Sequence, residues 1–149
     1  EGFKPIYLMA LTLGFVKECL QTPKKLRLDT CGRILSYCEY GSSNGFPIIH
    51  FHGFGQSRLE ALCQTNMAGL NNLRIICFDR PGYGESDADI ESNLESICND
   101  SIQFMRQLNI FNNDYALTGS TLGAKFIYKT LNIFNENGIQ SPKFVNTYN

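Results

Sequence analysis

The sequence predicts an α/β domain with a mostly parallel sheet and helices on both faces of that sheet. Short apolar segments typical of strands alternate with segments of about 12 to 18 residues in which apolar residues recur at helical spacing. Glycine-rich turns follow two of the strand-like segments, as they do where parallel strands lead into helices. A chain of 149 residues with 43% hydrophobic residues is long enough for one buried core.

We divide the chain into an N-terminal apolar helix, residues 1–22, and an α/β domain, residues 23–149. The apolar run over 6–16 is shorter than the roughly 20 residues that span a bilayer. We therefore expect it to pack on the domain or on a neighbouring protein, with contact to a membrane surface as the alternative. The chain does not begin with Met, and we expect it to be a fragment.

The first part of the domain is expected to form strands. Segment 24–41 predicts a hairpin, because polar and apolar residues alternate on both sides of a turn. Segment 46–51 is continuously apolar, which is typical of a strand buried on both faces. A helix follows, and we expect it to begin near Ser57, because Ser57 and Glu60 have the spacing of a capping box.

The second part of the domain alternates strands and helices. We expect a strand over 73–79, a helix over 93–109 with Ser92 and Glu95 as its capping box, a strand over 114–119, a helix over 122–134 and a last strand over 143–148. The sheet would then stop after about its fifth or sixth strand. Such an edge has unpaired N–H and C=O groups, so we expect self-association through it.

Charge and cysteine content restrict the classes of partner. The formal net charge is −1 and no basic block occurs, so no nucleic-acid partner is predicted. The six cysteines are scattered without a C-x-x-C pair, and the sequence has only two His, so no metal site is predicted. Several cysteines lie in apolar segments, which indicates reduced thiols and a cytoplasmic location.

One glycine-rich turn, "GSTLG" at 119–123, has the spacing of G-x-S-x-G with threonine at the serine position. A sharp strand-to-helix turn presents one side chain at its apex and points the first N–H groups of the helix at the same space. Thr121 is at this apex, and the N–H of Leu122 is expected to face an oxygen bound there. Ser120 is expected to be a turn residue, with its presentation by a shifted turn as the alternative.

A second glycine-rich turn, "HGFG" at 52–55, follows the strand-like segment 46–51. The N–H of Phe54 is the expected second donor, and Gly53 would let the backbone approach. Two such donors are the usual means of stabilising a developing oxyanion. The two turns together therefore predict an oxyanion site.

Two nucleotide-binding motifs are weaker interpretations of the glycine-rich turns. A phosphate loop counted from Gly119 would need glycine at Ala124 and a hydroxyl group at Phe126. A dinucleotide fingerprint in "GYGESD" would need glycine at Asp87.

Three motifs in order resemble a known family. They are "EYGSSNGFPIIHFHGFGQSRLEA", "CFDRPGYGESD" and "YALTGSTLGAKF", and together they resemble the N-terminal half of an α/β-hydrolase over roughly residues 24–134. The resemblance implies hydrolysis of an ester, an epoxide or a similar small substrate without a dissociable cofactor. It places Thr121 at the nucleophile position and His52 in the oxyanion loop.

The chain departs from the family pattern at its catalytic residues. Threonine replaces the nucleophilic serine, and no His follows His52, so no complete triad can be assigned. Two interpretations stay open: a hydrolase with weak activity in this chain alone, and a catalytically inactive binding domain or fragment. Asp79, Arg80 and Ser86 are expected to tie their loop to the sheet.

Overall fold

A six-stranded sheet forms the centre of the computed structural model, which describes residues 22–148. Its strands lie in the order β1-β2-β4-β3-β5-β6. Their bounds are Lys24–Arg27 for β1, Ile34–Gly41 for β2, Phe46–Phe51 for β3, Leu73–Phe78 for β4, Ala116–Ser120 for β5 and Phe144–Tyr148 for β6. The predicted N-terminal helix lies, apart from its last residue, outside the described residues.

The sheet is mixed, with one antiparallel end. β1 pairs antiparallel with β2, and β2 pairs antiparallel with β4, while β4, β3, β5 and β6 run parallel to one another. The predicted hairpin and the mostly parallel sheet are confirmed. The carboxyl ends of β3, β4 and β5 therefore meet at the same edge of the sheet, where ligands bind in open α/β sheets.

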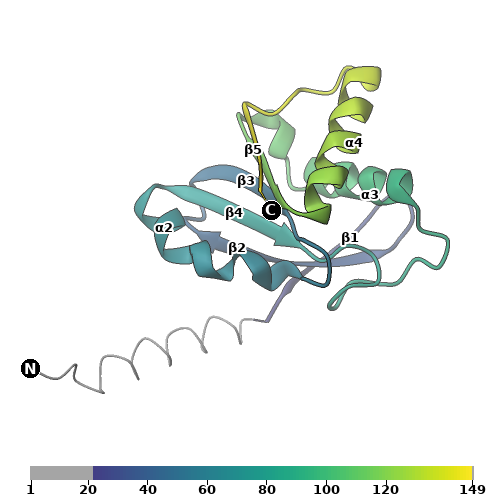
Figure 1. Cartoon of the computed structure of the whole chain (residues 1–149), viewed down its shortest axis with the longest axis horizontal. Helices are drawn as coiled ribbons and strands as arrows, with labels where there is room; N and C mark the ends of the chain where they lie inside the picture. The colour runs from purple at the N-terminus through teal and green to yellow at the C-terminus, as the bar shows by residue number, and fades with distance from the viewer. Residues whose placement is uncertain (1–21, 149) are drawn as a thin grey trace, which may run out of the picture.

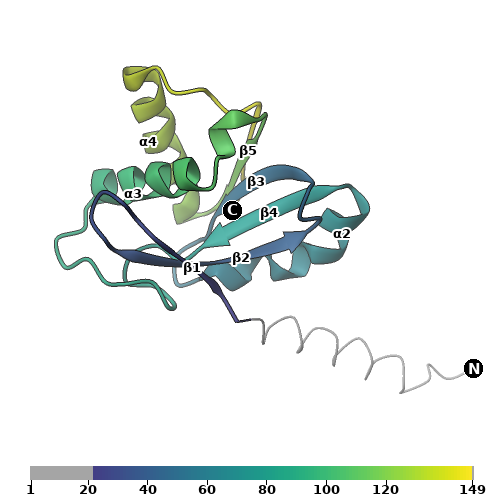
Figure 2. The same cartoon turned by 180° about the vertical axis from the view of Figure 1, so that it is seen from behind.

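Helices cover both faces of the sheet, as the sequence predicts. The 3-10 helix η1 (Arg58–Gln64) and α2 (Thr65–Leu70) lie on one face, and α3 (Leu94–Gln107) and α4 (Leu122–Asn137) lie on the other (Figures 1 and 2). Alternate residues of β4 pack against the helices on opposite faces of the sheet, because successive side chains of a strand point to opposite faces. Ile76 packs with α3 and α4, whereas Ile75 and Cys77 pack with η1 and α2. A further 3-10 turn, η2 (Ile110–Asn112), precedes β5.

The expected capping box at the start of η1 is wrong. Ser57 is the N-cap, and its side chain accepts the N–H of Leu59 at 3.3 Å. The side chain of Glu60 does not return the bond to the Ser57 backbone, because it turns toward the ends of β3 and β5 instead. The segment after Ser57 is a 3-10 helix before it becomes α-helical at Thr65.

The capping box of α3 is displaced by one residue from the expected pair of Ser92 and Glu95. Asn93 is the N-cap, and its side chain accepts the N–H of Ser96 at 2.9 Å. The Ser96 hydroxyl accepts the Asn93 N–H at 2.9 Å. The Ser92 N–H instead closes the preceding turn on the carbonyl of Asp89.

β6 forms an open edge of the described sheet, and the expected stop after a fifth or sixth strand is confirmed. Its Phe144 and Val145 side chains are 62% and 43% exposed. An apolar hollow of about 400 Å³ lies beside it on the η1 and α2 face, lined by Phe46, Ile48, Leu73, Ala116, Leu117, Thr118, Phe144 and Asn146.

The described cysteines are free thiols, and three of them, Cys38, Cys77 and Cys98, are buried. Cys19 lies outside the described residues. Among residues 22–148, no helix has the length and apolarity needed to cross a membrane. The same residues contain no group of three or more His, Cys, Asp or Glu side chains placed to hold a metal ion.

Two helical glycines provide a test of how closely α4 approaches β3. A Cβ atom on Gly123 would overlap the carbonyl oxygen of Phe51, whereas a Cβ atom on Gly69 would meet open space. We expect Gly123→Ala to lower the free energy of unfolding by about 3 kcal/mol through overpacking. Gly69→Ala in α2 should be neutral or should stabilise by up to about 1 kcal/mol. Urea unfolding of both variants checks this, and equal stability would contradict it.

Candidate active site

The chain passes from β5 to α4 through a single residue, Thr121. Ser120 ends the strand and Leu122 begins the helix. Thr121 has φ 43° and ψ −108°, a conformation that β-branched residues rarely adopt. Such strain costs on the order of 1 to 3 kcal/mol. The turn therefore has the predicted strand-to-helix form, with the exposed Thr121 at its apex.

The loop that follows β3 lies directly against this turn. A Cβ atom on Gly53 would come within 2.7 Å of Thr121 Oγ1 and 2.8 Å of Ser120 Oγ. A side chain at position 53 would therefore push the loop away from the turn. The absence of a Cβ atom lets the backbone approach, as the sequence predicts.

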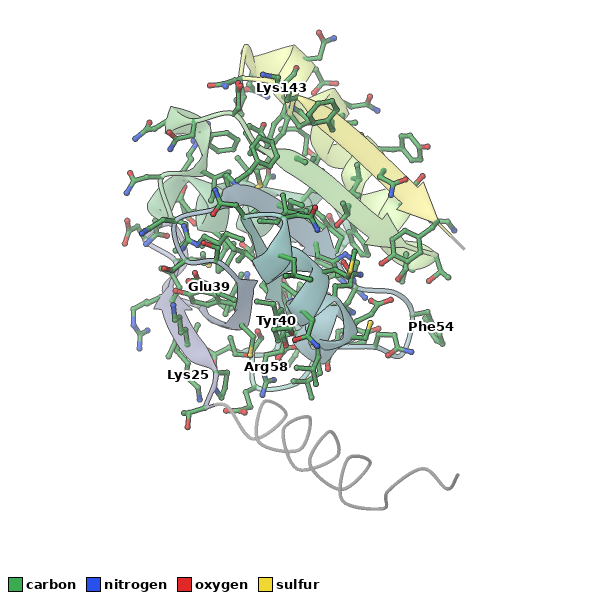
Figure 3. The ribbon with its side chains drawn as sticks, turned by 90° about the vertical axis from the view of Figure 1, so that its left-hand side faces the viewer. Lys25, Glu39, Tyr40, Phe54, Arg58 and Lys143 are labelled. Carbon is green, nitrogen blue, oxygen red and sulfur yellow. The ribbon has the colours of Figure 1, made fainter. Side chains whose placement is uncertain are left out.

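The two predicted oxyanion donors lie where the loop after β3 meets the turn at Thr121, one in the loop and one at the start of α4. The N–H of Phe54 donates to Thr121 Oγ1 at 3.3 Å. Leu122 is the first residue of α4, so its N–H has no acceptor within the helix. The Phe54 ring is 77% exposed and points away from the sheet (Figure 3). The structure thus brings His52, Gly53, Phe54, Thr121 and Leu122 together.

His52 is fully buried beneath the loop, and both of its ring nitrogens have partners. Nδ1 lies 3.0 Å from the carbonyl oxygen of Gly53, and Nε2 accepts the N–H of Arg80 at 3.4 Å. These partners place the proton on Nδ1. Burial, followed by the nearby charge of Arg80, lowers the pKa of His52 to about 4. His52 is therefore neutral at pH 7 and holds the loop.

Arg80 binds the backbone carbonyl groups of the loop that follows β3. The guanidinium donates to the carbonyl oxygen of His52, and to that of Gly53 at 3.1 Å. It also lies over the rings of Tyr83 and Phe126, at 4.9 Å and 4.7 Å from their centroids. Burial lowers the pKa of Arg80. Arg80 thus ties its own loop to the turn after β3, which agrees with the structural role expected for it, although the sequence did not indicate its partners in that turn.

Asp79 and Ser86 tie their loop to the sheet, as expected. The Asp79 carboxylate accepts the Arg58 N–H at 2.7 Å and the Ser36 hydroxyl at 2.6 Å. The Ser86 hydroxyl donates to the Asp79 carbonyl oxygen at 2.7 Å. Burial alone would raise the pKa of Asp79, but the hydrogen bonds that its carboxylate accepts from Arg58 and Ser36 lower it.

Arg58 is held in place from its backbone as well as from its side chain. Its guanidinium donates to Asp79 at 2.5 Å and to Glu85 at 2.8 Å. Its carbonyl oxygen accepts the Tyr40 hydroxyl at 2.9 Å, and Figure 3 shows these two residues on adjacent elements. The first turn of η1 is therefore fixed to both β2 and the end of β4.

Glu60 is the site residue that sequence reasoning missed, because its spacing from Ser57 indicated a helix cap. Its carboxylate accepts the N–H of Gly53 at 2.7 Å and the hydroxyl of Ser120. Ser120 is buried and its hydroxyl points at Glu60, so β5 does not present it at the apex. Among the described residues, Phe54 N–H alone is hydrogen-bonded to Thr121 Oγ1.

Acidification is expected to destabilise the domain through its buried imidazoles. Burial lowers the pKa of both His50 and His52, and that of His52 falls to about 4. The unfolded chain binds these protons at higher pH than the folded chain, so stability present above pH 6.5 is lost as the pH falls toward 4. The His52 contribution is on the order of 3 kcal/mol.

Urea unfolding at pH 7, 5.5 and 4 measures this loss. We expect a shallower pH dependence in His52→Gln, because the amide can both donate and accept without titrating. An identical pH dependence in the two proteins would contradict the prediction.

No protein-family model and no curated protein matches the sequence. Solved structures do match the fold. An esterase from Thermogutta terrifontis is 21% identical, with a TM-score of 0.64, over 76% of this chain and 42% of its own. An epoxide hydrolase from Vigna radiata is 19% identical, with a TM-score of 0.67, over 84% of this chain and 39% of its own.

A bromoperoxidase from Bacillus anthracis is 19% identical, with a TM-score of 0.70, over 85% of this chain and 44% of its own. The chain thus spans less than half of the length of each of these three structures. All three are α/β-hydrolase fold proteins. Together with the strand order and the strand-to-helix turn, these matches show that the chain has the α/β-hydrolase fold.

Proposed function

We propose that this chain forms the oxyanion part of a hydrolase site for a small ester, an epoxide or a similar substrate. The supporting observation is the contact between the Phe54 N–H and Thr121 Oγ1 at 3.3 Å, which directs a backbone donor at the nucleophile position. The similar structures include an esterase and an epoxide hydrolase, which favours this reaction class.

The two backbone donors would act on the substrate oxygen that gains charge. Attack on an ester carbonyl turns its oxygen into an oxyanion, and the N–H groups of Phe54 and Leu122 would stabilise that charge. Removing one such donor typically costs about 2.7 to 4 kcal/mol of transition-state stabilisation. The substrate would take the place of Thr121 Oγ1 as the acceptor of the Phe54 N–H.

Thr121 is a weak nucleophile in this chain, because nothing described removes its proton. Its hydroxyl accepts a bond from Phe54 N–H, and neither His is bonded to it. His50 Nδ1 lies 2.9 Å from Thr118 Oγ1, and His52 is engaged with Gly53 and Arg80. A site without a complete triad retains only about 10³ to 10⁴ of rate acceleration over water. These contacts favour a second candidate function, a binding domain without turnover.

Turnover of p-nitrophenyl acetate tests the catalytic part of the proposal. We expect the chain to hydrolyse this ester at a negligible rate, within a few-fold of Thr121→Ala, because the hydroxyl has no base. Thr121→Ser relieves the crowding of the β-branched residue but adds no base, so it should not restore turnover. A robust rate that Thr121→Ala abolishes would show that Thr121 is an active nucleophile.

Binding of a tetrahedral anion tests the oxyanion part separately. The probe is p-nitrophenyl methylphosphonate, and binding is followed by the amide resonances of Phe54 and Leu122. Gly53→Ala should lower the affinity at least about tenfold, because the new Cβ atom forces the loop off Thr121. Gly69→Ala serves as the matched control. If the phosphonate shifts neither amide resonance in the unmodified chain, the oxyanion site is ruled out.

We also propose that the isolated chain associates through β6 with β6 of a second copy. Residues 144–148 include no charged side chain, so antiparallel pairing of two copies would oppose no like charges. Sedimentation velocity should show concentration-dependent dimers that Val145→Lys removes. Tyr128→Lys, on the exposed surface of α4, is the control and should leave them intact. Monomers at every concentration would contradict the proposal.

The remaining expectations stay proposals. A small molecule is the proposed partner, and the scattered, partly buried thiols favour a reducing, cytoplasmic environment. Contact of the 6–16 segment with a membrane surface concerns residues outside the described range.

A further inference from the structure

We infer that Glu60 is a positioning residue for the oxyanion site, acting with Arg80 on the two peptide groups between His52 and Phe54. The inference rests on the proposed function insofar as it concerns ligand binding. Glu60 comes from η1 and Arg80 from the end of β4, so two separate elements hold one short loop.

The two charged side chains bind opposite ends of the same peptide group. The carbonyl oxygen of His52 accepts a bond from Arg80, and the N–H of Gly53 donates to Glu60 at 2.7 Å. The C=O and N–H of a trans peptide point in opposite directions. A peptide held at both ends by opposite charges cannot rotate without losing one charge-assisted hydrogen bond.

The orientation of the next peptide group, between Gly53 and Phe54, is fixed in the same way. Arg80 also binds the carbonyl oxygen of Gly53 at 3.1 Å, and this oxygen belongs to the same peptide as the Phe54 N–H. Both carbonyls therefore face Arg80, and both N–H groups face Glu60 and the turn. Consecutive N–H groups on one side form a concave anion site. Glu60 occupies the first N–H, and the second is left for Thr121 or a ligand.

The state of the Glu60 carboxyl suits this role. Burial alone would raise its pKa, but hydrogen bonds from Ser120 and Gly53 outweigh burial and lower it. The ionised carboxylate can only accept hydrogen bonds, so the Ser120 hydroxyl must donate to it. Ser120 thereby ties Glu60 to the end of β5, one residue before Thr121.

The ring of His50 lies beside the Glu60 carboxylate and restricts its movement toward β3. Its ring is fully buried, and Nε2 lies 3.4 Å from the Glu60 carboxylate without making a hydrogen bond to any described residue. Nδ1 is held by Thr118, and the ring stacks on Tyr148 of β6 at a centroid distance of 6.2 Å. The carboxylate therefore lies among groups from β3, β5 and the loop, and the Glu60 side chain is 19% exposed.

Amide hydrogen exchange of Phe54 and phosphonate affinity together test this role. In Glu60→Ala, the Gly53 N–H loses its acceptor, so we expect Phe54 to exchange about tenfold faster and the affinity for p-nitrophenyl methylphosphonate to fall about tenfold. Glu60→Gln should restore most of both values, because its amide oxygen can accept the same N–H. Glu95→Ala is the control, since Glu95 of α3 is exposed and pairs with Lys129 of α4.

The two readouts separate this inference from the proposed function. If the unmodified chain binds no phosphonate but Phe54 exchanges faster in Glu60→Ala, the proposed function fails and the role of Glu60 in holding the loop stands. If Phe54 exchange and affinity are both unchanged in folded Glu60→Ala, the inference is overturned. Should Glu60→Ala not fold, Glu60→Asp, which is one methylene shorter, replaces it with the same two outcomes.

Discussion

The close approach of the end of β3 to the start of α4 is the contact on which the site depends. At Gly123, α4 lies so near to Phe51 that a Cβ atom would overlap the strand's carbonyl oxygen. At Gly53, the loop lies so near to Thr121 that a Cβ atom would displace it. If a side chain replaced Gly53 or Gly123, the Phe54 N–H could not reach the apex of the turn. The backbone donors are thus placed by the absence of side chains rather than by their presence.

The 3-10 helix η1 connects this contact to the rest of the sheet. Arg58 in η1 binds Asp79 at the end of β4, and Glu60, two residues later, binds Gly53 at the end of β3. Arg80, next to Asp79, binds the same loop from the opposite side. The ends of β3 and β4 are therefore linked through the Arg58–Asp79 ion pair and through the bonds of Glu60 and Arg80 to the loop after β3. Since Arg58 and Asp79 are buried, their ion pair is screened little by salt.

The sequence predicts the elements well because periodicity and glycine reflect local and sheet-level constraints. The continuous apolar run 46–51 and the alternation over 24–41 each became the expected strand or hairpin. The turn at Thr121 was recognisable because its flanking glycines are a property of the backbone path. The strand and hairpin patterns depend on residues close together in the chain, and the glycines of the turn stand at a fixed spacing, so one sequence suffices to recognise them.

The parts that sequence reasoning missed depend on which partner a polar side chain finds in the folded chain. Ser57 and Glu60 have capping-box spacing, but a carboxylate near a free Gly53 N–H and the Ser120 hydroxyl has stronger competing partners. The same limit applies to Ser92, since Asn93 takes the cap one residue later. Arg80 is similar, because its acceptors are backbone carbonyls that no side-chain pattern marks.

In this structure the Thr121 hydroxyl occupies the Phe54 N–H, and the strength of that bond decides whether a ligand could replace it. At 3.3 Å, it is a long bond between neutral groups, and such bonds contribute about 0.5 to 1.5 kcal/mol, against about 1.5 to 3 kcal/mol for bonds to charged groups. In the proposed site, an anionic oxygen would therefore displace the hydroxyl from the Phe54 N–H. The Thr121 side chain can then rotate only among the few χ1 positions open to a β-branched residue. In the proposed function, binding of an oxyanion would thus depend on the loop, whereas attack by Thr121 would depend on a base.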